Sequence, residues 1–454
     1  MYETVLSIVE HVYALVYGPP LLILLCGVGV YLTIRLKGLQ FRYLRYSLKL
    51  AFGKSEDSGD GDISHFQSLM TALAATVGTG NLAGVATGIA VGGFGALFWM
   101  WITALIGMAT KYAEAILAVK YRVRDARGQM SGGPMHFIEQ GLGWKWLAIS
   151  FAFFGCFAAF GGGNMIQANS VADVMQNVFG VDPLVSAFVM AAITAVTLLG
   201  GIKSISRVAS LLVPFMAVLY IGGASLVLIQ RLDLIPGALY LIVSSAFTGQ
   251  AAVGGFLGSG IILALQVGVS RGLMTSEAGL GTASIASAAA KTDTPGKQAL
   301  VSMTGSFLAT VIMCTVTGLV LAVTGVLGQV GADGKIITGA SMTVLAFNSV
   351  VPWGGYIVSL SLILFAFTTI VGWAYYGEKC VEYMLGAKSI PYFRIIFTLV
   401  CFAGALLELQ LVWKISDIFN GLMAFPNLIA LCALSPIVIR ETKSFIVQLQ
   451  AQPT

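Results

Sequence analysis

Long apolar stretches separated by short polar ones dominate the chain. A membrane-spanning helix needs roughly 20 mostly apolar residues, and eleven stretches meet that requirement. The runs are continuous rather than alternating, and lipid offers no partner for an unpaired backbone group, so helices are expected and a membrane β-barrel is not. The expected spans are 14–36, 66–92, 95–119, 146–178, 184–201, 208–230, 253–289, 299–328, 354–377, 391–411 and 415–438.

Two of these spans carry glycine-rich polar interruptions, Thr76–Asn81 (Thr-Val-Gly-Thr-Gly-Asn) and Ser270–Gly281. Glycine is unfavourable inside a helix, so both spans are expected to unwind there. The two broken spans cross in opposite directions, and each opens a set of five spans. This is the inverted-repeat arrangement of transporters.

The pattern therefore predicts an all-α polytopic membrane protein with two discontinuous helices and one extra helix before the repeats. The expected parts are a peripheral helix with an amphipathic cytoplasmic segment at 1–61, a first five-helix repeat at 62–232, a second at 233–440 and a cytoplasmic tail at 441–454.

The basic residues are unevenly divided between the loops. When the loops are placed alternately on two sides of a membrane, 20 of the 25 Lys and Arg residues fall on one side. Cytoplasmic loops collect Lys and Arg. We therefore expect an integral plasma (inner) membrane protein with its N-terminus outside and its C-terminus in the cytoplasm. The same distribution accounts for the net charge of +5 without a nucleic-acid partner.

Composition agrees with a membrane class. The chain is 57% hydrophobic and only 10% charged, whereas soluble domains carry about 25% charged residues. The six cysteines have no paired spacing, so free thiols are expected. No H-E-x-x-H motif occurs, and Gly78-Thr-Gly80 follows no strand. We expect no enzyme, no organic cofactor and no obligate protein partner other than the lipid bilayer.

The first interruption has the chemistry of a binding site. Free N–H groups at the start of a half-helix suit a carboxylate, and free carbonyls suit a sodium ion. The residues of this loop that are expected to line the substrate site are Thr76, Gly78, Thr79, Gly80 and Asn81. The carbonyls of Ala75 and Gly78 are expected to face the ion. The alternative is a glycine pair that lets helices pack closely.

Other polar residues at membrane depth extend this hypothesis. Asn164 and Gln167 share a helix face, with Asn169 nearby, and they would either bind a polar solute or bond a neighbouring helix. The hydroxyls of Thr368 and Thr369 would either ligate a small cation or bond their own helix. Trp373 lies four residues after Thr369, on the same face, where it could wall the cavity.

Four charges fall inside the expected spans. Lys111 and Glu114 are three residues apart on one helix, and we expect them to neutralise each other. Arg271 and Glu277 flank the second interruption, where they would either hold the loop or act in gating.

These residues resemble the alanine/glycine:cation symporters, also called sodium:alanine symporters. Similarity runs through nearly the whole chain and is strongest in five motifs: 76–81, Gly92–Gly107, Ser131-Gly-Gly-Pro-Met135, Gly163–Asn169 and Ser276–Gly281. The resemblance implies a LeuT-type fold and sodium-coupled uptake of alanine or glycine. It also implies a sodium site formed by the carbonyls of Ala75, Gly78 and Phe365 with the hydroxyls of Thr368 and Thr369. His136 stands where the family pattern suggests an aromatic residue.

The expected function is sodium-coupled symport of a small neutral amino acid by alternating access. A proton-coupled carrier of the same fold is one alternative, with Glu114 and Glu277 as the only deep candidates for a proton site. A non-transporting amino-acid sensor is another. The partners expected for sodium-coupled symport are alanine or glycine, sodium and the lipid bilayer.

Overall fold

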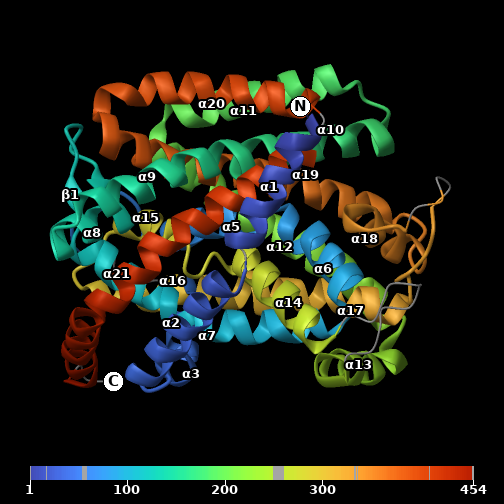
Figure 1. Cartoon of the computed structure of the whole chain (residues 1–454), viewed down its shortest axis with the longest axis horizontal. Helices are drawn as coiled ribbons and strands as arrows, with labels where there is room; N and C mark the ends of the chain where they lie inside the picture. Colours follow the sequence, from blue (N-terminus) through green and yellow to red (C-terminus); the bar gives the residue numbers. More distant parts are fainter. Residues whose placement is uncertain are drawn as a thin grey trace.

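The computed structural model describes residues 2–16, 18–53, 59–248, 260–331, 334, 336–407 and 410–451, and this part of the chain is almost entirely helical (Figure 1). Eight of its helices are long and apolar enough to cross a membrane, and one bent helix pair gives a ninth. The expected spans 184–201 and 253–289 fall on shorter apolar helices, and the start of the second lies outside the described residues. The count of eleven therefore stays a prediction, as does the inverted repeat.

The first half of the described chain contains the first broken span and the helices that follow it. Its elements are α1 (Tyr2–Val16), α2 (Pro19–Arg35), α3 (Leu39–Arg42), α4 (Leu44–Phe52), α5 (His65–Thr76), η1 (Gly80–Gly84), α6 (Val85–Gly92), α7 (Gly95–Lys120), β1 (Val123–Arg124), β2 (Met130–Ser131), α8 (Pro134–Leu142), α9 (Lys145–Phe160), η2 (Gly161–Met165), α10 (Ile166–Phe179), α11 (Pro183–Leu199) and α12 (Gly201–Ile229).

The second half contains the second broken span. Its elements are η3 (Leu232–Leu234), α13 (Ile235–Thr248), α14 (Ile261–Ser276), α15 (Thr282–Ala288), α16 (Pro295–Ser306), η4 (Phe307–Cys314), α17 (Thr315–Thr324), α18 (Gly339–Asn348), α19 (Gly354–Leu385), η5 (Ala387–Ser389), α20 (Ile390–Leu406) and α21 (Gln410–Ala451).

Both interruptions break their helices. A capping box starts α5, in which the Ser64 hydroxyl accepts from Gln67 N and Ser64 N donates to Gln67 Oε1, each at 3.1 Å. The helix stops at Thr76, and the pair α5 and η1–α6 is bent by 56°. The second helix stops at Ser276 and resumes at Thr282 after a left-handed residue at Glu277. The expectation of two discontinuous helices agrees with this geometry.

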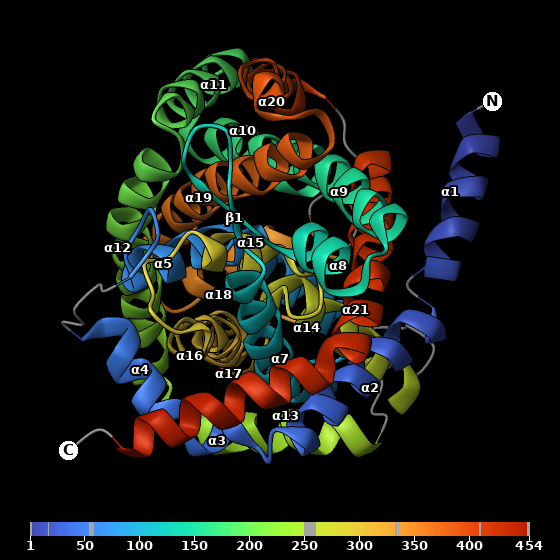
Figure 2. The same ribbon diagram turned by 90° about the vertical axis from the view of Figure 1, so that its left-hand side faces the viewer.

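Two enclosed helices organise the bundle. In their most apolar stretches α7 is 83% and α19 is 78% buried, more than the other unbroken candidate spans among the described residues. α14 and α16 pack on α7, whereas α5, α9 and α12 pack on α19. The two breaks consequently meet between α7 and α19. α11 and α20 lie together at one edge, and α1 lies on the outside, where it contacts α21 (Figures 1 and 2).

Some elements were not expected. α13 and α18 are short helices between the expected spans, and three of the expected spans contain described π-helical segments, η1, η2 and η4. A π-turn holds one more residue than an α-turn and often marks a functional site. The run Gly161-Gly-Gly163 is a local sequence signal for η2.

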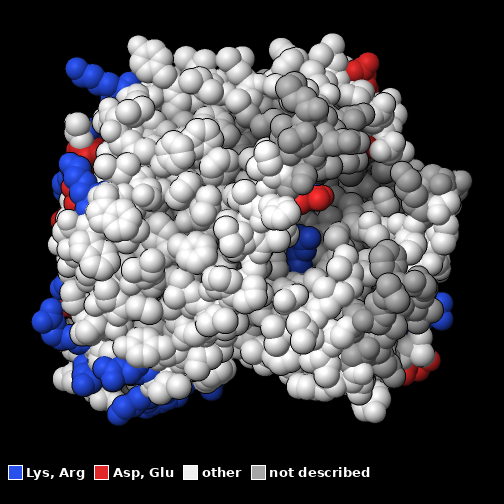
Figure 3. Space-filling view, viewed as in Figure 1, with Lys and Arg blue, Asp and Glu red and all other residues white. Residues whose placement is uncertain are grey.

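Charged side chains are concentrated at one end of the molecule. On the face shown in Figure 3, most Lys and Arg side chains gather at the end where β1 and α8 lie, and the middle is almost uncharged. This distribution is that of a membrane protein with one basic end. The predicted direction of the two termini stays a prediction.

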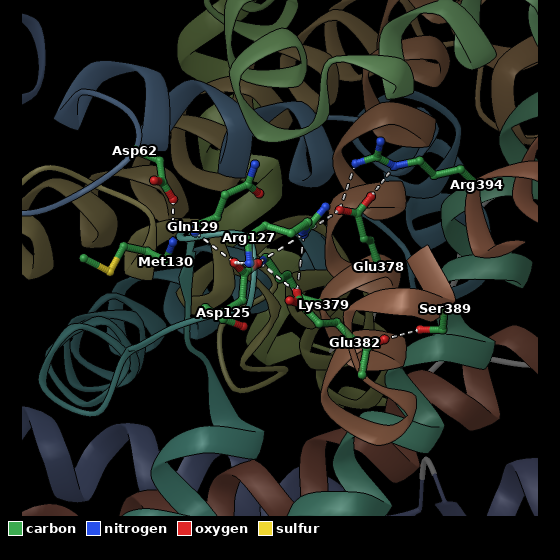
Figure 4. A network of polar contacts seen from close by, with 12 residues as sticks. Asp62, Asp125, Arg127, Gln129, Met130, Glu378, Lys379, Glu382, Ser389 and Arg394 are labelled. Atoms are coloured by element: carbon green, nitrogen blue, oxygen red, sulfur yellow. Dashed lines mark hydrogen bonds and ion pairs between the residues drawn. The ribbon is translucent and has the colours of Figure 1, made fainter. Parts of the chain in front are cut away.

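An ion-pair network closes that basic end. Lys379 of α19 is fully buried and lies 3.1 Å from Asp125 Oδ2 in the β1–β2 hairpin and 2.8 Å from Glu382 Oε2. Arg127 reaches Asp125 and Glu378, and Arg394 of α20 binds the Glu378 carboxylate at 2.7 Å (Figure 4). The hairpin is therefore tied to the ends of α19 and α20.

Candidate binding site between the broken helices

A small cavity lies where the two breaks meet. Its volume is about 80 Å³, and its walls come from α5, η1, η2, α10, α14, α19 and α21 with the residues of both breaks. Eight of the predicted site residues line it: Ala75, Thr76, Gly78, Thr79, Gly80, Gln167, Thr369 and Trp373. Residues from both halves of the chain therefore meet around one cavity.

The end of α5 is joined to the second break through one carboxylate. Thr76 Oγ1 donates to Ala72 O at 2.7 Å and lies 3.1 Å from Glu277 Oε2. Thr282 Oγ1, at the start of α15, lies 3.1 Å from the same oxygen. Glu277 is 2% exposed and faces the cavity. The unwound segments thus hold one another through side chains rather than through helix hydrogen bonds.

Asn81 fixes the shape of the first break. Its Oδ1 accepts from Gly78 N at 3.1 Å, and its Nδ2 donates to Ala309 O of η4 at 2.7 Å. Thr317 Oγ1 donates to Asn81 O at 3.0 Å. The side chain is fully buried and points towards η4, so it does not line the cavity. Within the described residues its contacts are structural.

The two threonines of α19 point in different directions. Thr369 Oγ1 donates to Ala74 O at 3.2 Å, across to the last turn of α5. Thr368 Oγ1 lies 3.1 Å from Phe365 O on its own helix and 3.5 Å from Met216 Sδ. Gly372 lets α19 approach α5, because a Cβ there would lie 2.8 Å from the Cβ and N of Ala75. Only Thr369 therefore faces the broken helix directly.

The amides near η2 have three different surroundings. Gln167 Nε2 donates to Gly162 O at 3.1 Å, and its buried Oε1 has no partner among the described residues. Asn164 Nδ2 donates to Phe397 O at 2.7 Å, and Asn169 Nδ2 donates to Leu407 O at 2.9 Å. Asn164 and Asn169 bond α20 and the residue after it and do not line the cavity.

Trp373 packs tightly on η2. A Cβ on Gly163 would lie 2.4 Å from Trp373 Cβ, so only glycine leaves room for the indole. The ring lies 5.8 Å from that of Tyr376 and borders the cavity. The predicted wall of the cavity is therefore held between α19 and a glycine-rich π-turn.

Sequence reasoning missed the face that α21 contributes. The cavity is also lined by Trp413, Ser416, Asp417 and Asn420, and Ser416 Oγ and Asn420 Oδ1 are buried without a partner in the described part of the chain. Positions 413, 416, 417 and 420 follow helical spacing within an apolar stretch. That periodicity was the available signal.

Lys111 and Glu114 attract each other electrostatically, as expected, but they form no direct ion pair in the described part of the chain. Glu114 Oε1 accepts from Gly279 N at 3.0 Å and from Asn427 Nδ2 at 2.7 Å. No described carboxylate lies within 4.0 Å of the Lys111 ammonium, and its strongest electrostatic interaction is with Glu277, followed by Glu114. The local spacing favoured the i,i+3 pair, but the second break supplies Glu114 with better hydrogen-bond donors.

A helical membrane bundle with a polar cavity between two broken helices is the architecture of a membrane transporter. The same fold occurs in the crystal structure of MhsT in complex with L-phenylalanine, with a TM-score of 0.59, 15% identity and coverage of 85% of this chain and 93% of that one. The model of the sodium:alanine symporter family matches residues 2–454. This chain belongs to that family.

Its relatives agree along nearly their whole lengths. It is 54% identical to the sodium/alanine symporter AgcS of Methanococcus maripaludis, over 97% of both chains. It is 37% identical to the amino-acid carrier protein AlsT of Bacillus subtilis, over 93% of this chain and 88% of that one. Sodium-coupled amino-acid symport, an integral membrane location and a LeuT-type fold follow from the family.

Proposed function

We propose that this protein carries alanine or glycine into the cell together with sodium by alternating access. The cavity between the broken helices carries this proposal. A water molecule needs about 15 Å³ of such volume, so a cavity of about 80 Å³ has room for a solute the size of glycine or alanine and little more. A larger side chain would have to displace Trp373 or Gln167.

The carboxylate of the substrate would lie at the start of η1. A half-helix presents unpaired N–H groups and a positive dipole end to an anion. Thr79 and Gly80 stand at this point and line the cavity. Gln167 would add a polar contact through an amide oxygen that is buried and has no partner among the described residues.

The sodium ion would lie between the last turn of α5 and α19. Small hard cations take oxygen ligands. The proposed ligands are the carbonyls of Ala75, Gly78 and Phe365 and the hydroxyls of Thr368 and Thr369. Two observations support this choice: Thr369 Oγ1 already reaches the α5 backbone at Ala74 O, and Thr368 Oγ1 and Phe365 O lie 3.1 Å apart. Asn81 would act indirectly by shaping the loop that presents Gly78.

Coupling would follow from the position of the ion. A ligand shifts a conformational equilibrium only by its differential affinity for the two states. Sodium that bridges α5 and α19 binds only the state in which these helices are close, and that state also completes the substrate cavity. The membrane potential adds about 2.3 kcal/mol per charge per 100 mV to inward transport.

Uptake into proteoliposomes tests the proposal. Labelled alanine is expected to accumulate under an inward sodium gradient, and potassium with or without a proton gradient should give none. Proton-driven uptake would transfer the coupling to a carboxylate, and absence of uptake under either gradient would favour the sensor.

A matched pair of variants tests the ion site. Thr369→Val keeps the shape but loses the hydroxyl, so the sodium concentration for half-maximal uptake should rise at least about tenfold, which corresponds to about 1.4 kcal/mol. Thr369→Ser keeps the hydroxyl and should remain within about threefold of the parent protein. Equal effects of the two substitutions would exclude Thr369 Oγ1 as a ligand.

A further inference from the structure

Glu277 has an unusual backbone conformation for its residue type. It follows the last residue of α14 with φ of 52°, in the left-handed region where helices commonly end on glycine. Among the described residues only Lys37 is another non-glycine residue with positive φ. A strained residue persists where the surrounding structure holds it, and such residues gather at functional sites. A carboxylate at a glycine position therefore needs a reason.

The surroundings of Glu277 point its carboxylate at the cavity. One oxygen lies 3.1 Å from each of the hydroxyls of Thr76 and Thr282. These partners come from α5 and α15, so the helices on either side of the two breaks orient one acid. The residue is 2% exposed and is part of the cavity wall.

The charges around this carboxylate do not balance. Lys111 lies behind it and interacts electrostatically with both Glu277 and Glu114. Glu114 Oε1 accepts from Gly279 N and Asn427 Nδ2, its Oε2 is buried without a partner among the described residues, and the residue does not line the cavity. One ammonium thus serves two carboxylates at membrane depth, where an uncompensated charge is costly.

The other charged pair on the wall does not fill this deficit. Arg271 and Asp417 both line the cavity and attract one another. No further Lys, Arg or His among the described residues lines the cavity. A small cation or a cationic group entering the cavity would therefore meet the Glu277 carboxylate on a wall where the other carboxylate, Asp417, already has Arg271 to attract it.

We propose that the Glu277 carboxylate binds the α-ammonium group of the transported amino acid, with Lys111 as the resident counter-charge behind it. The inference rests on the proposed function and deepens it. The ammonium group would lie against Glu277 while the substrate carboxylate lies at the start of η1, on the facing break. The site would then select for a primary amine and reject hydroxy acids and simple carboxylates of the same size.

Binding to the purified full-length protein at saturating sodium tests the assignment. Glu277→Gln keeps the side-chain shape and an acceptor for Thr76 and Thr282 but removes the charge. Alanine affinity should fall at least about 30-fold, because truncating one partner of a buried charge pair is costly. Stabilisation by sodium alone, measured as a thermal shift, should persist. Glu114→Gln is the matched control, equally buried but away from the cavity, and should stay within about fivefold.

Competition on the unmodified protein decides the question even where a variant fails to fold. Lactate has the methyl and carboxylate groups of alanine with a hydroxyl in place of the ammonium, so it should not displace labelled alanine at a hundredfold excess over the alanine Kd. Displacement by lactate within tenfold of alanine, or unchanged alanine binding by Glu277→Gln, would overturn the assignment. Equal loss of sodium and alanine binding in Glu277→Gln would make the residue structural and also overturn it. A parent protein that binds no alanine would instead refute the proposed function.

Discussion

Gly78 lies beside the proposed ion and leaves little room for an added side chain. A Cβ at Gly78 would lie 2.6 Å from Thr369 Oγ1, with Thr369 Cβ and Gln167 Oε1 next at 3.5 and 3.6 Å. The substitution Gly78→Ala therefore collides with one atom only. That atom is the hydroxyl that joins α19 to Ala74 O.

The cost of Gly78→Ala can be worked out from these contacts. Ordinary contact begins at 3.4 Å, so the Thr369 hydroxyl must retreat by roughly 0.8 Å or rotate away. Retreat is an overpacking strain of about 1–3 kcal/mol, and rotation breaks a hydrogen bond with a net value of about 0.5–1.5 kcal/mol. A cost near 2 kcal/mol that falls on the sodium-bound state would weaken sodium binding roughly 30-fold.

Thermal unfolding in detergent at increasing sodium concentration measures both effects. Gly78→Ala should lower the midpoint and shift the sodium titration to higher concentrations. Gly222→Ala is the matched control, since Gly222 is an exposed glycine within α12 whose Cβ would meet nothing within 4 Å. That control should be neutral or more stable by up to about 1 kcal/mol.

A double-mutant cycle isolates the cause. If the hydroxyl is the obstacle, Gly78→Ala should cost about 1–3 kcal/mol less in a Thr369→Ala background than in the parent protein. Strict additivity of the two substitutions, or a Gly78→Ala protein with the parent's sodium titration, would refute the steric reasoning.

Three further perturbations have defined outcomes. Asn81→Ala removes the ties to Gly78 N and Ala309 O, so it should destabilise the protein by about 1–3 kcal/mol in thermal unfolding and weaken sodium binding through the loop. Lys379→Met leaves the carboxylates of Asp125 and Glu382 without their buried counter-charge, and chemical unfolding should show a loss of about 3–5 kcal/mol. Burial, with the charge of Lys379, lowers the pKa of His136 to about 4. The pKa of His136 in the unfolded chain lies near 6.5, so above that pH its protonation costs the folded state no stability. As the pH drops from 7 to 4, the free energy of unfolding should fall by about 3 kcal/mol.

Each of these predictions has a discriminating control. Asn81→Asp keeps an acceptor for Gly78 N but loses the donor to Ala309 O. If both Asn81 variants were as stable as the parent protein, these two hydrogen bonds would not stabilise the loop. Lys379→Arg retains the charge and should recover part of the loss. His136→Phe keeps the edge contact with Tyr383, whose ring lies 5.3 Å away. This substitution should flatten the dependence of the free energy of unfolding on pH. An unchanged slope would mean that other groups cause that dependence.

The order of apolar and polar residues along the sequence was enough to predict the class of protein and the places where its helices break. Apolar runs of span length leave helix as the only form that satisfies the backbone in lipid. The glycines at 78 and 80 lower the cost of interrupting a helix, so the first break was predictable from the segment itself. This loop, with Ala75 directly before it, then supplied five of the residues that line the cavity: Ala75, Thr76, Gly78, Thr79 and Gly80.

Only the tertiary structure decided which polar side chains face the cavity. Asn81 turns to η4 because Ala309 O lies there as an acceptor, and Thr368 turns to Phe365 O while its neighbour Thr369 reaches α5. Glu114 Oε1 accepts a hydrogen bond from Gly279 N in the second break, more than 160 residues away in sequence. The direction of a side chain at an unwound or buried position depends on partners from distant segments, and the sequence contains no local signal for such partners.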